Sequence, residues 1–159
     1  MNRELRRVGL VIMAMLFKVA AVPFHFWSPD VYEGSPALTT ALMSTLAKVV
    51  AMATLYKLLS VMNADISDAY KMVIVAVSMA SMTVGNIMAL KQTNVKRMLA
   101  FSGISHAGFM LMTLLSLATS ASSLLYYTTA YALAGIAAFS VILYVCKNKH
   151  NEDITNFHG

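Results

Sequence analysis

The sequence predicts an all-α protein, a polytopic bundle of about five transmembrane helices, from its composition and from the lengths of its apolar runs. Of its 159 residues, 58% are hydrophobic and only 12% are charged, roughly half the charged share of a soluble domain, and the mean hydropathy is +0.67. Five runs approach the roughly 20 residues that a helix needs to cross a bilayer. The strict alternation of a membrane β-barrel is missing from them.

The net charge of +5 does not indicate a nucleic-acid partner, because the basic residues lie at the ends of apolar runs and form no cluster with aromatic residues. The expected environment is instead the lipid bilayer.

The first expected span covers residues 8–27. A signal peptide begins in a similar way, but Lys18, Pro23 and His25 interrupt this run and no small-residue cleavage site follows. Pro23 cannot donate a hydrogen bond to the carbonyl of Val19, and its ring clashes with that turn. The span should therefore be broken near Pro23. Such breaks are tolerated at membrane depth where the freed backbone lines a polar cavity, and a simple kink without a role is the alternative.

The remaining runs are joined by short polar connections, so neighbouring helices should run antiparallel. We expect residues 1–159 to form one membrane domain, because no linker or shift in composition divides them. The four further spans are residues 37–59, with Lys48 inside, residues 72–90 and 124–146, without a charge, and residues 98–118, with His106 inside.

Two lysines lie deep in expected spans. Lys18 is about ten residues into the first span and Lys48 about eleven into the second, so neither amine reaches an interface easily. A charge at that depth costs at least about 2.5–3.5 kcal/mol. Because burial disfavours the charged form of an amine, we interpret both lysines as proton carriers facing a hydrated interior. A lysine that snorkels from a misjudged helix end is the alternative for each.

All seven acidic residues lie outside the expected spans, so neither lysine has a carboxylate at its own depth. Buried cations without a counter-ion are costly. A partner must therefore come from another segment or subunit, or the two amines are often neutral.

Two histidines extend the expected proton path. His25 follows Lys18 by seven residues, which is the same face if the helix resumes, and histidine titrates near neutral pH. The alternative is an interfacial histidine bonded to a loop carbonyl. His106 lies one turn from Ser102, and it either passes protons or merely hydrogen-bonds that serine.

Ser44 precedes Lys48 by one turn, so it is expected to bond the amine or to hold water beside it. Lys96 and Arg97 open the fourth span, where cations are unfavourable at a helix N-terminus, and we expect them to be interface anchors. No second ligand stands at metal spacing from either histidine. The lone Cys146 supports neither a disulfide nor an iron–sulfur site, so we expect no metal or cofactor in this chain.

Two long stretches resemble a known family. They are "FKVAAVPFHFWSPDVYEGSPALTTALMSTLAKVV", residues 17–50, and "GNIMALKQTNVKRMLAFSGISHAGFML", residues 85–111. Both are similar to the antiporter-like membrane subunits of respiratory complex I, an NADH:quinone oxidoreductase, which share their fold with subunits of multi-component cation/proton antiporters. The loop "PDVYEGSP", residues 29–36, favours one of the three complex I subunits over its sisters. Gly103 departs from the family, which usually has a serine there, and so does Ser35, where alanine is usual.

The resemblance implies proton translocation along buried lysines and water, coupled to quinone reduction elsewhere. Family members are about three times this length, and the chain matches their middle third. Lys18 then matches the lysine of a broken helix, Lys48 the lysine of the next helix, and His106 a histidine further on. The family's ion-pairing glutamate lies outside this chain, in agreement with the missing carboxylate.

The implied setting is a bacterial inner membrane, where the chain would be a non-redox subunit of a translocase. Its implied partners are other membrane subunits of complex I and the missing spans of the same subunit, while NADH, FMN, iron–sulfur clusters and quinone belong to the parent complex. Two other functions stay open: a subunit of a cation/proton antiporter, and a non-transporting scaffold fragment.

Overall fold

The protein is described here by a computed structural model covering residues 3–61, 68–115, 120–147 and 152–157, and the all-α fold class is confirmed. Within those ranges, extended pairing is limited to one isolated bridge between Asn94 and Asp153. The helices are α1 (Arg3–Lys18), α2 (Trp27–Gly34), α3 (Ala37–Ser44), α4 (Leu46–Val61), α5 (Asp68–Ala89), α6 (Val95–Thr113) and α7 (Ser120–Val145), followed by the 3₁₀ helix η1 (Ile154–Phe157).

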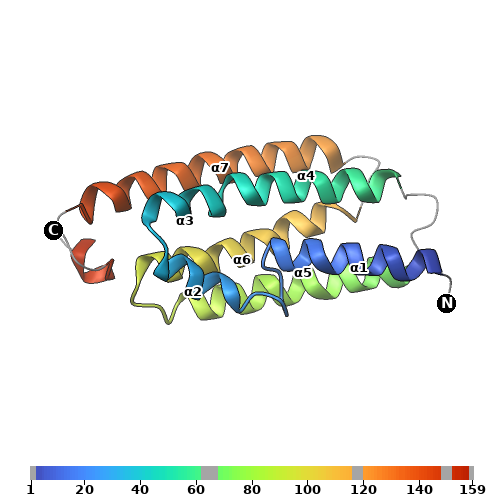
Figure 1. Cartoon of the computed structure of the whole chain (residues 1–159), viewed down its shortest axis with the longest axis horizontal. Coiled ribbons are helices and arrows are strands. Elements are labelled where there is room, and N and C mark those ends of the chain that lie inside the picture. Colours follow the sequence, from blue (N-terminus) through green and yellow to red (C-terminus); the bar gives the residue numbers. More distant parts are fainter. Residues whose placement is uncertain (1–2, 62–67, 116–119, 148–151, 158–159) are drawn as a thin grey trace.

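The helices form an elongated bundle in which the successive long helices α4, α5, α6 and α7 run in alternating directions (Figure 1). The most extensive packing is between α5 and α6. α4 and α7 lie side by side on the other side of the bundle, and α3 continues the line of α4. One end of the bundle carries α2, the α5–α6 connection and the C-terminal segment, and the N-terminus lies at the opposite end.

Three helical stretches are long and apolar enough to cross a bilayer: Ala37–Val61, Tyr70–Ala89 and Ala121–Val145. They coincide within a few residues with the second, third and fifth expected spans. The apolar part of α1, Gly9–Lys18, is shorter than a span, and residues 116–118 of the expected fourth span lie outside the described residues. The structure is thus a polytopic bundle, while the count of five spans stays a prediction.

The first expected span is interrupted earlier than Pro23. α1 ends at Lys18, and residues 19–26 run as turns until α2 begins at Trp27. Ala20 has a φ of 58°, and the backbone N–H of Val22 donates to the hydroxyl of Ser81 on α5 at 2.9 Å. The contribution of Pro23 to this break stays a prediction.

Small residues allow α5 and α6 to pack closely. A Cβ atom at Gly85 would lie 2.7 Å from the backbone nitrogen of Ser105 and 2.8 Å from the carbonyl oxygen of Phe101. Ser78 adds a hydrogen bond across the same interface, from its hydroxyl to the Gly108 carbonyl at 2.7 Å. Close backbone approach and polar bonds of this kind stabilise helix pairs in membranes, so α5 and α6 form the frame on which the site is built.

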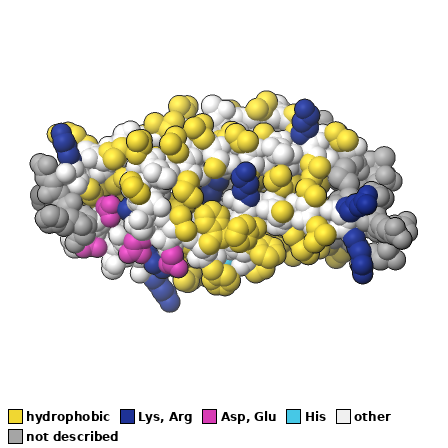
Figure 2. Space-filling model, in the orientation of Figure 1, with side chains coloured by type: hydrophobic (Ala, Val, Ile, Leu, Met, Phe, Trp, Pro, Cys, Tyr) yellow, Lys and Arg dark blue, Asp and Glu magenta, His cyan; other side chains and the backbone are white. Residues whose placement is uncertain are grey.

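The outer surface has the polarity expected of a membrane bundle. Hydrophobic side chains spread over the middle of the visible face, and acidic side chains gather toward the end that carries α2 (Figure 2). Large apolar residues such as Leu10, Leu90 and Leu125 are each more than 60% exposed. An apolar surface of this extent needs lipid or other protein segments against it.

Candidate functional site

Lys48 is the buried charge around which the site is built. It lies in the first turn of α4, and only 3% of the residue is exposed. Among the described residues, its Nζ atom has no hydrogen-bond partner. A buried amine without a counter-ion is costly. Packing of an otherwise apolar helix does not explain a lysine here, which indicates a functional role for Lys48.

Gly103 on α6 makes room for the amine. A Cβ atom at this position would lie only 2.6 Å from Lys48 Nζ and 3.0 Å from the hydroxyl oxygen of Tyr131 on α7. Both polar atoms therefore occupy the space that a side chain would fill. Gly103 is the residue against which α4 and α7 present their polar groups.

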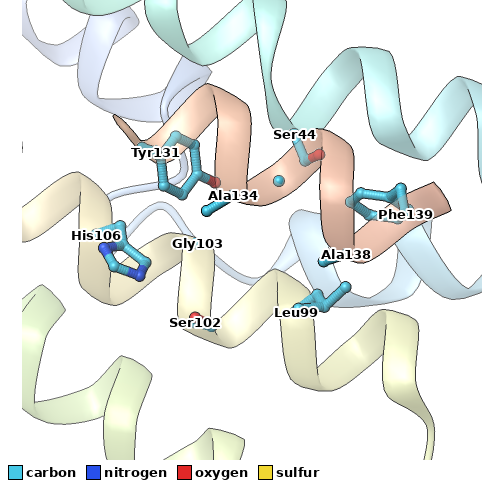
Figure 3. Close-up of a pocket in the computed structure, with 10 residues that line it drawn as sticks. Ser44, Leu99, Ser102, Gly103, His106, Tyr131, Ala134, Ala138 and Phe139 are labelled. Carbon is cyan, nitrogen blue, oxygen red and sulfur yellow. The ribbon is translucent and has the colours of Figure 1, made fainter. Parts of the chain in front are cut away.

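A cavity of about 190 Å³ lies beside this point, between α3, α6 and α7. Figure 3 shows Tyr131 and His106 next to each other at one side of it, and their ring centroids are 5.1 Å apart. The cavity is large enough to hold water, and its hydroxyl and imidazole groups are suitable water partners. Its lining residues are Ser44, Leu99, Ser102, Gly103, His106, Tyr131, Ala134, Gly135, Ala138 and Phe139.

His106 is held by a tyrosine and not by the serine on its own helix. Its Nδ1 atom lies 2.8 Å from the hydroxyl oxygen of Tyr127 on α7. The alternative in which His106 merely hydrogen-bonds Ser102 is therefore not what the structure shows, because the bonding partner is Tyr127. Lys48 is also close enough for its charge to act on the imidazole, so the two titratable groups share one electrostatic environment.

Ser44 lines the cavity but does not bond Lys48. Its hydroxyl donates to the carbonyl of Ala41, one turn earlier on α3, at 3.0 Å. Hydrogen bonds of this type to the preceding turn are common for serine in helices. The direct bond expected between Ser44 and Lys48 is therefore absent among the described residues, and only the water-holding role stays open.

Lys18 is exposed rather than buried in a shared interior with Lys48. It lies at the end of α1 in a shallow hollow lined by Ala14, Phe17 and Trp27. The indole N–H of Trp27 donates to the Phe17 carbonyl at 3.1 Å, which folds the break back over the helix end. The expectation of one interior seam for both lysines is thus not met within the described part of this chain, because α1 ends with Lys18 on its outer face.

His25 is buried in the break, with 7% of the residue exposed. The helix does not resume before Trp27, so His25 does not share a helical face with Lys18. Its Nδ1 atom and the hydroxyl of Ser28 are buried without a hydrogen-bond partner among the described residues. The structure therefore brings Ser44, Lys48, Ser102 and His106 together, and it leaves Lys18 and His25 apart from them.

Lys96 is a buried residue and not an interface anchor. It is 3% exposed, and its Nζ atom donates to the Ser35 carbonyl at 2.9 Å and pairs with a Glu152 carboxylate oxygen at 3.0 Å. The backbone N–H of Val95 donates to the Glu152 carbonyl at 2.9 Å. The C-terminal segment is thereby fixed to the start of α6.

Arg97 makes a second ion-paired contact at the same end, with Asp30 at 2.9 Å and Glu33 at 2.7 Å, both on α2. Its hydrogen bond to Glu33, together with the charges of both carboxylates, holds the pKa of the Arg97 guanidinium above its usual range. The side chain of Asn94 caps α6 by accepting from the backbone N–H groups of Lys96 and Arg97. The expected cost of cations at this N-terminus is therefore offset by the cap and by three acidic groups.

Sequence reasoning missed Tyr127 and Tyr131. They stand four residues apart in the first part of an apolar run, which places them on one face of a helix. This four-residue spacing is the sequence signal that could have identified the two tyrosines. Among the described residues, no group of three or more histidine, cysteine, aspartate or glutamate side chains is placed to hold a metal ion.

Residues 3–159 match the family described as NADH:quinone oxidoreductase/Mrp antiporter, transmembrane. The chain is 73% identical, over 161 aligned residues, to NADH-quinone oxidoreductase subunit N of Flavobacterium johnsoniae, and 37% identical to that of Neisseria gonorrhoeae. The two alignments cover 96% and 99% of this chain but 35% and 34% of the relatives. The chain thus spans about a third of the length of the curated relatives that it matches.

Two solved structures contain chains of similar fold. One is respiratory complex I of Thermus thermophilus with bound aureothin, with a TM-score of 0.72 and 38% identity over 87% of this chain and 30% of that one. The other is an archaeal membrane-bound sulfane sulfur reductase, with a TM-score of 0.84 over 96% of this chain and 32% of that one, and its 24% identity shows a common fold alone. Together with the match over nearly the whole chain, these likenesses establish that the chain belongs to the NADH:quinone oxidoreductase/Mrp antiporter transmembrane family.

Proposed function

We propose that this chain is the central part of a proton-translocating subunit, of the subunit N type, in a bacterial NADH:quinone oxidoreductase. The relatives that support this carry the name NADH-quinone oxidoreductase subunit N, and one structural neighbour is a respiratory complex I. The location is the inner membrane, with several passes. The partners are the other membrane subunits of that complex and the remaining spans of the same subunit.

The observation that carries the proposal is the Lys48 amine. It is buried, it has no hydrogen-bond partner among the described residues, and it lies against Gly103, one of the residues that line the cavity. A structural lysine at this depth would be expected to have a carboxylate or several carbonyl groups around it. An amine without them is suited to gain and lose a proton.

The proposed step is transfer between Lys48 and His106 by way of the cavity. The ammonium releases a proton toward the cavity, and the imidazole accepts it at Nε2, since Nδ1 is engaged by Tyr127. Ser102 and Ser44 support the step by holding water in the cavity, since both line it. A change in charge on either group alters the free energy of protonation of the other, because the two groups interact electrostatically.

Lys18, Pro23 and His25 belong to a second part of the path at the break. Lys18 is exposed on this chain, and about two thirds of each relative's length lies outside it. We propose that segments outside the chain cover this face and connect Lys18 to the site. His25 lies in the break itself, and its Nδ1 atom, which has no hydrogen-bond partner among the described residues, is the acceptor that we assign to this part of the path.

The chain's own role is non-redox in this proposal. Electrons from NADH pass to quinone through cofactors of other subunits, FMN and iron–sulfur clusters among them, while this chain moves protons. It holds no cofactor of its own, and it is a component of an enzyme complex rather than a separate enzyme.

The test is Lys48→Ala in the full-length subunit, assembled in the complex in inverted membrane vesicles. We expect normal assembly but a loss of NADH-driven proton uptake per NADH oxidised. Lys48→Arg should lose uptake too, because arginine keeps its proton. The matched control is Lys57→Ala, which removes an exposed lysine from the same helix.

The alternatives give different results. Normal proton uptake in assembled Lys48→Ala complexes would favour a scaffold role and would contradict the proposal. Sodium- or potassium-dependent proton exchange without NADH, lost in the same variant, would instead indicate a cation/proton antiporter subunit.

A further inference from the structure

Two tyrosines of α7 lie where the proposed path crosses from α4 to α6. Tyr127 holds Nδ1 of His106 at 2.8 Å. Tyr131, one turn further along α7, places its ring centroid 5.1 Å from that of the same imidazole and lines the cavity. The sequence-based path contained neither residue.

The hydroxyl of Tyr131 is directed to the space that the Lys48 amine also enters. Both atoms lie within 3.0 Å of the position that a Cβ atom at Gly103 would take. The phenol thus approaches the amine with its oxygen and the imidazole with its ring (Figure 3 shows the tyrosine and the histidine).

The other hydroxyls of the cavity are less suitable. Ser44 already donates its proton to the Ala41 carbonyl, so it must break that bond before it can pass a proton on. Ser102 lies on the same helix as His106, one turn away, and among the described residues its hydroxyl makes no hydrogen bond to the Lys48 amine, which has no partner. We therefore assign the proton crossing from α4 to α6 to Tyr131, the residue that α7 places beside both helices.

We propose that Tyr131 is the relay residue between Lys48 and His106. The inference rests on the proposed function and adds a residue to it. The Tyr131 oxygen accepts a proton from the ammonium through a water molecule, since the amine makes no direct hydrogen bond among the described residues, while its own O–H proton passes through cavity water to Nε2 of His106. Lysine loses one N–H bond, histidine gains one, and the phenol ends with the same atoms and charge. A hydroxyl can do this because it is both donor and acceptor.

In this chain, Gly103 leaves room for the amine and the phenol to meet. Because a side chain at this position would displace the amine, the phenol or both, the glycine permits their approach. Tyr127 acts differently, because it orients the imidazole. When His106 donates from Nδ1 to Tyr127, Nε2 is left as the acceptor that the relay needs.

The experiment compares Tyr131→Phe with Tyr126→Phe in the full-length subunit of assembled complexes in inverted vesicles. Tyr126 is the matched control, because it lies on the same helix and is 78% exposed. Proton uptake is measured per NADH oxidised and per assembled complex. We expect Tyr131→Phe to lower uptake by about tenfold, less than the roughly 100- to 10,000-fold that a general acid–base group contributes, because cavity water can partly replace the hydroxyl. Tyr126→Phe should leave uptake unchanged.

Gly103→Ala and Lys48→Ala complete the test. Gly103→Ala keeps every polar group, and the amine that its methyl group would displace ends a flexible side chain, so uptake should fall less than in Tyr131→Phe. Wild-type uptake in Tyr131→Phe, together with lost uptake in Lys48→Ala, would overturn the relay and leave the proposed function intact. Unchanged uptake in both would overturn the proposed function itself.

Discussion

The Nδ1 atom of His106 and the hydroxyl oxygen of Tyr127 lie 2.8 Å apart and join α6 to α7. A histidine whose Nδ1 atom is engaged in this way has a defined ring orientation, and its Nε2 atom is left for another partner. Tyr127 is thus a positioning residue, which acts on proton movement through the imidazole and does not carry the proton itself.

Tyr127→Phe should therefore reduce proton uptake only moderately. The variant keeps the aromatic ring and removes one hydrogen bond, which is worth about 0.5–1.5 kcal/mol, or about two- to tenfold in the population of the active orientation. The measurement is NADH-driven proton uptake in inverted vesicles that contain the assembled full-length subunit.

A double variant separates orientation from simple loss of stability. In a His106→Ala background, Tyr127→Phe should have no further effect on uptake, because the group that it orients is gone. Additive losses in the double variant would contradict the positioning role. Tyr126→Phe again serves as the control on an exposed position of the same helix.

Gly85→Ala should weaken the α5–α6 pair. The added methyl group would lie 2.7 Å from the Ser105 nitrogen and 2.8 Å from the Phe101 carbonyl oxygen, and both are backbone atoms that cannot turn aside. Overpacking of this kind costs about 1–3 kcal/mol. We expect a lower yield of assembled complex and a lower midpoint of thermal inactivation.

The control for Gly85→Ala is Gly34→Ala at the end of α2, where no atom lies within 4 Å of the added methyl group. That variant should assemble like the wild type. Equal behaviour of the two variants would show that the close approach of α5 and α6 does not limit assembly.

The sequence predicts, for each apolar run taken by itself, that it is helical and roughly where the helix begins and ends. An apolar run of more than 20 residues in lipid has to satisfy its backbone internally, which predicts α7 and the combined α3–α4 stretch with ends correct to within a few residues. The burial of Lys48 follows from its depth in such a run. Its role, and those of His25, His106 and Pro23, remain predictions.

Which face of each helix is turned inward could not be predicted, because packing between distant segments decides it. Lys18 and Lys48 look alike in the sequence, yet one is exposed and the other buried. The meeting of Lys48, Gly103 and Tyr131 joins three helices far apart along the chain. A single sequence contains periodicity within each helix but no information on such pairs.

Arg97→Met should have a small effect that depends on salt. The guanidinium joins Asp30 and Glu33, whose side chains are 73% and 43% exposed, and exposed ion pairs contribute about 0–1 kcal/mol. We expect hydrogen exchange of residues 27–34 in the assembled complex to rise by less than about fivefold. The difference from the wild type should shrink at high ionic strength, and a difference that salt does not alter would contradict this account.

Lys96→Met should release the C-terminal segment. The amine is buried and bonded to both Ser35 and Glu152, and removing one partner of a buried pair costs about 3–5 kcal/mol. Because the Glu152 side chain is 28% exposed, water can solvate the carboxylate that Lys96 no longer pairs. We therefore expect a destabilisation at or below the lower end of that range. Hydrogen exchange of residues 93–95 and 152–157 should rise about tenfold or more.

The matched control is Lys91→Met, which removes an exposed lysine from the connection between α5 and α6. It should leave exchange at residues 152–157 unchanged, since the bonds between Val95 and Glu152 and between Thr93 and Ile154 do not involve it. Glu152→Gln should give an intermediate rise, because Lys96 keeps the Ser35 carbonyl. If Lys96→Met and Lys91→Met exchanged alike, the buried pair would not be what fixes the C-terminal segment to α6.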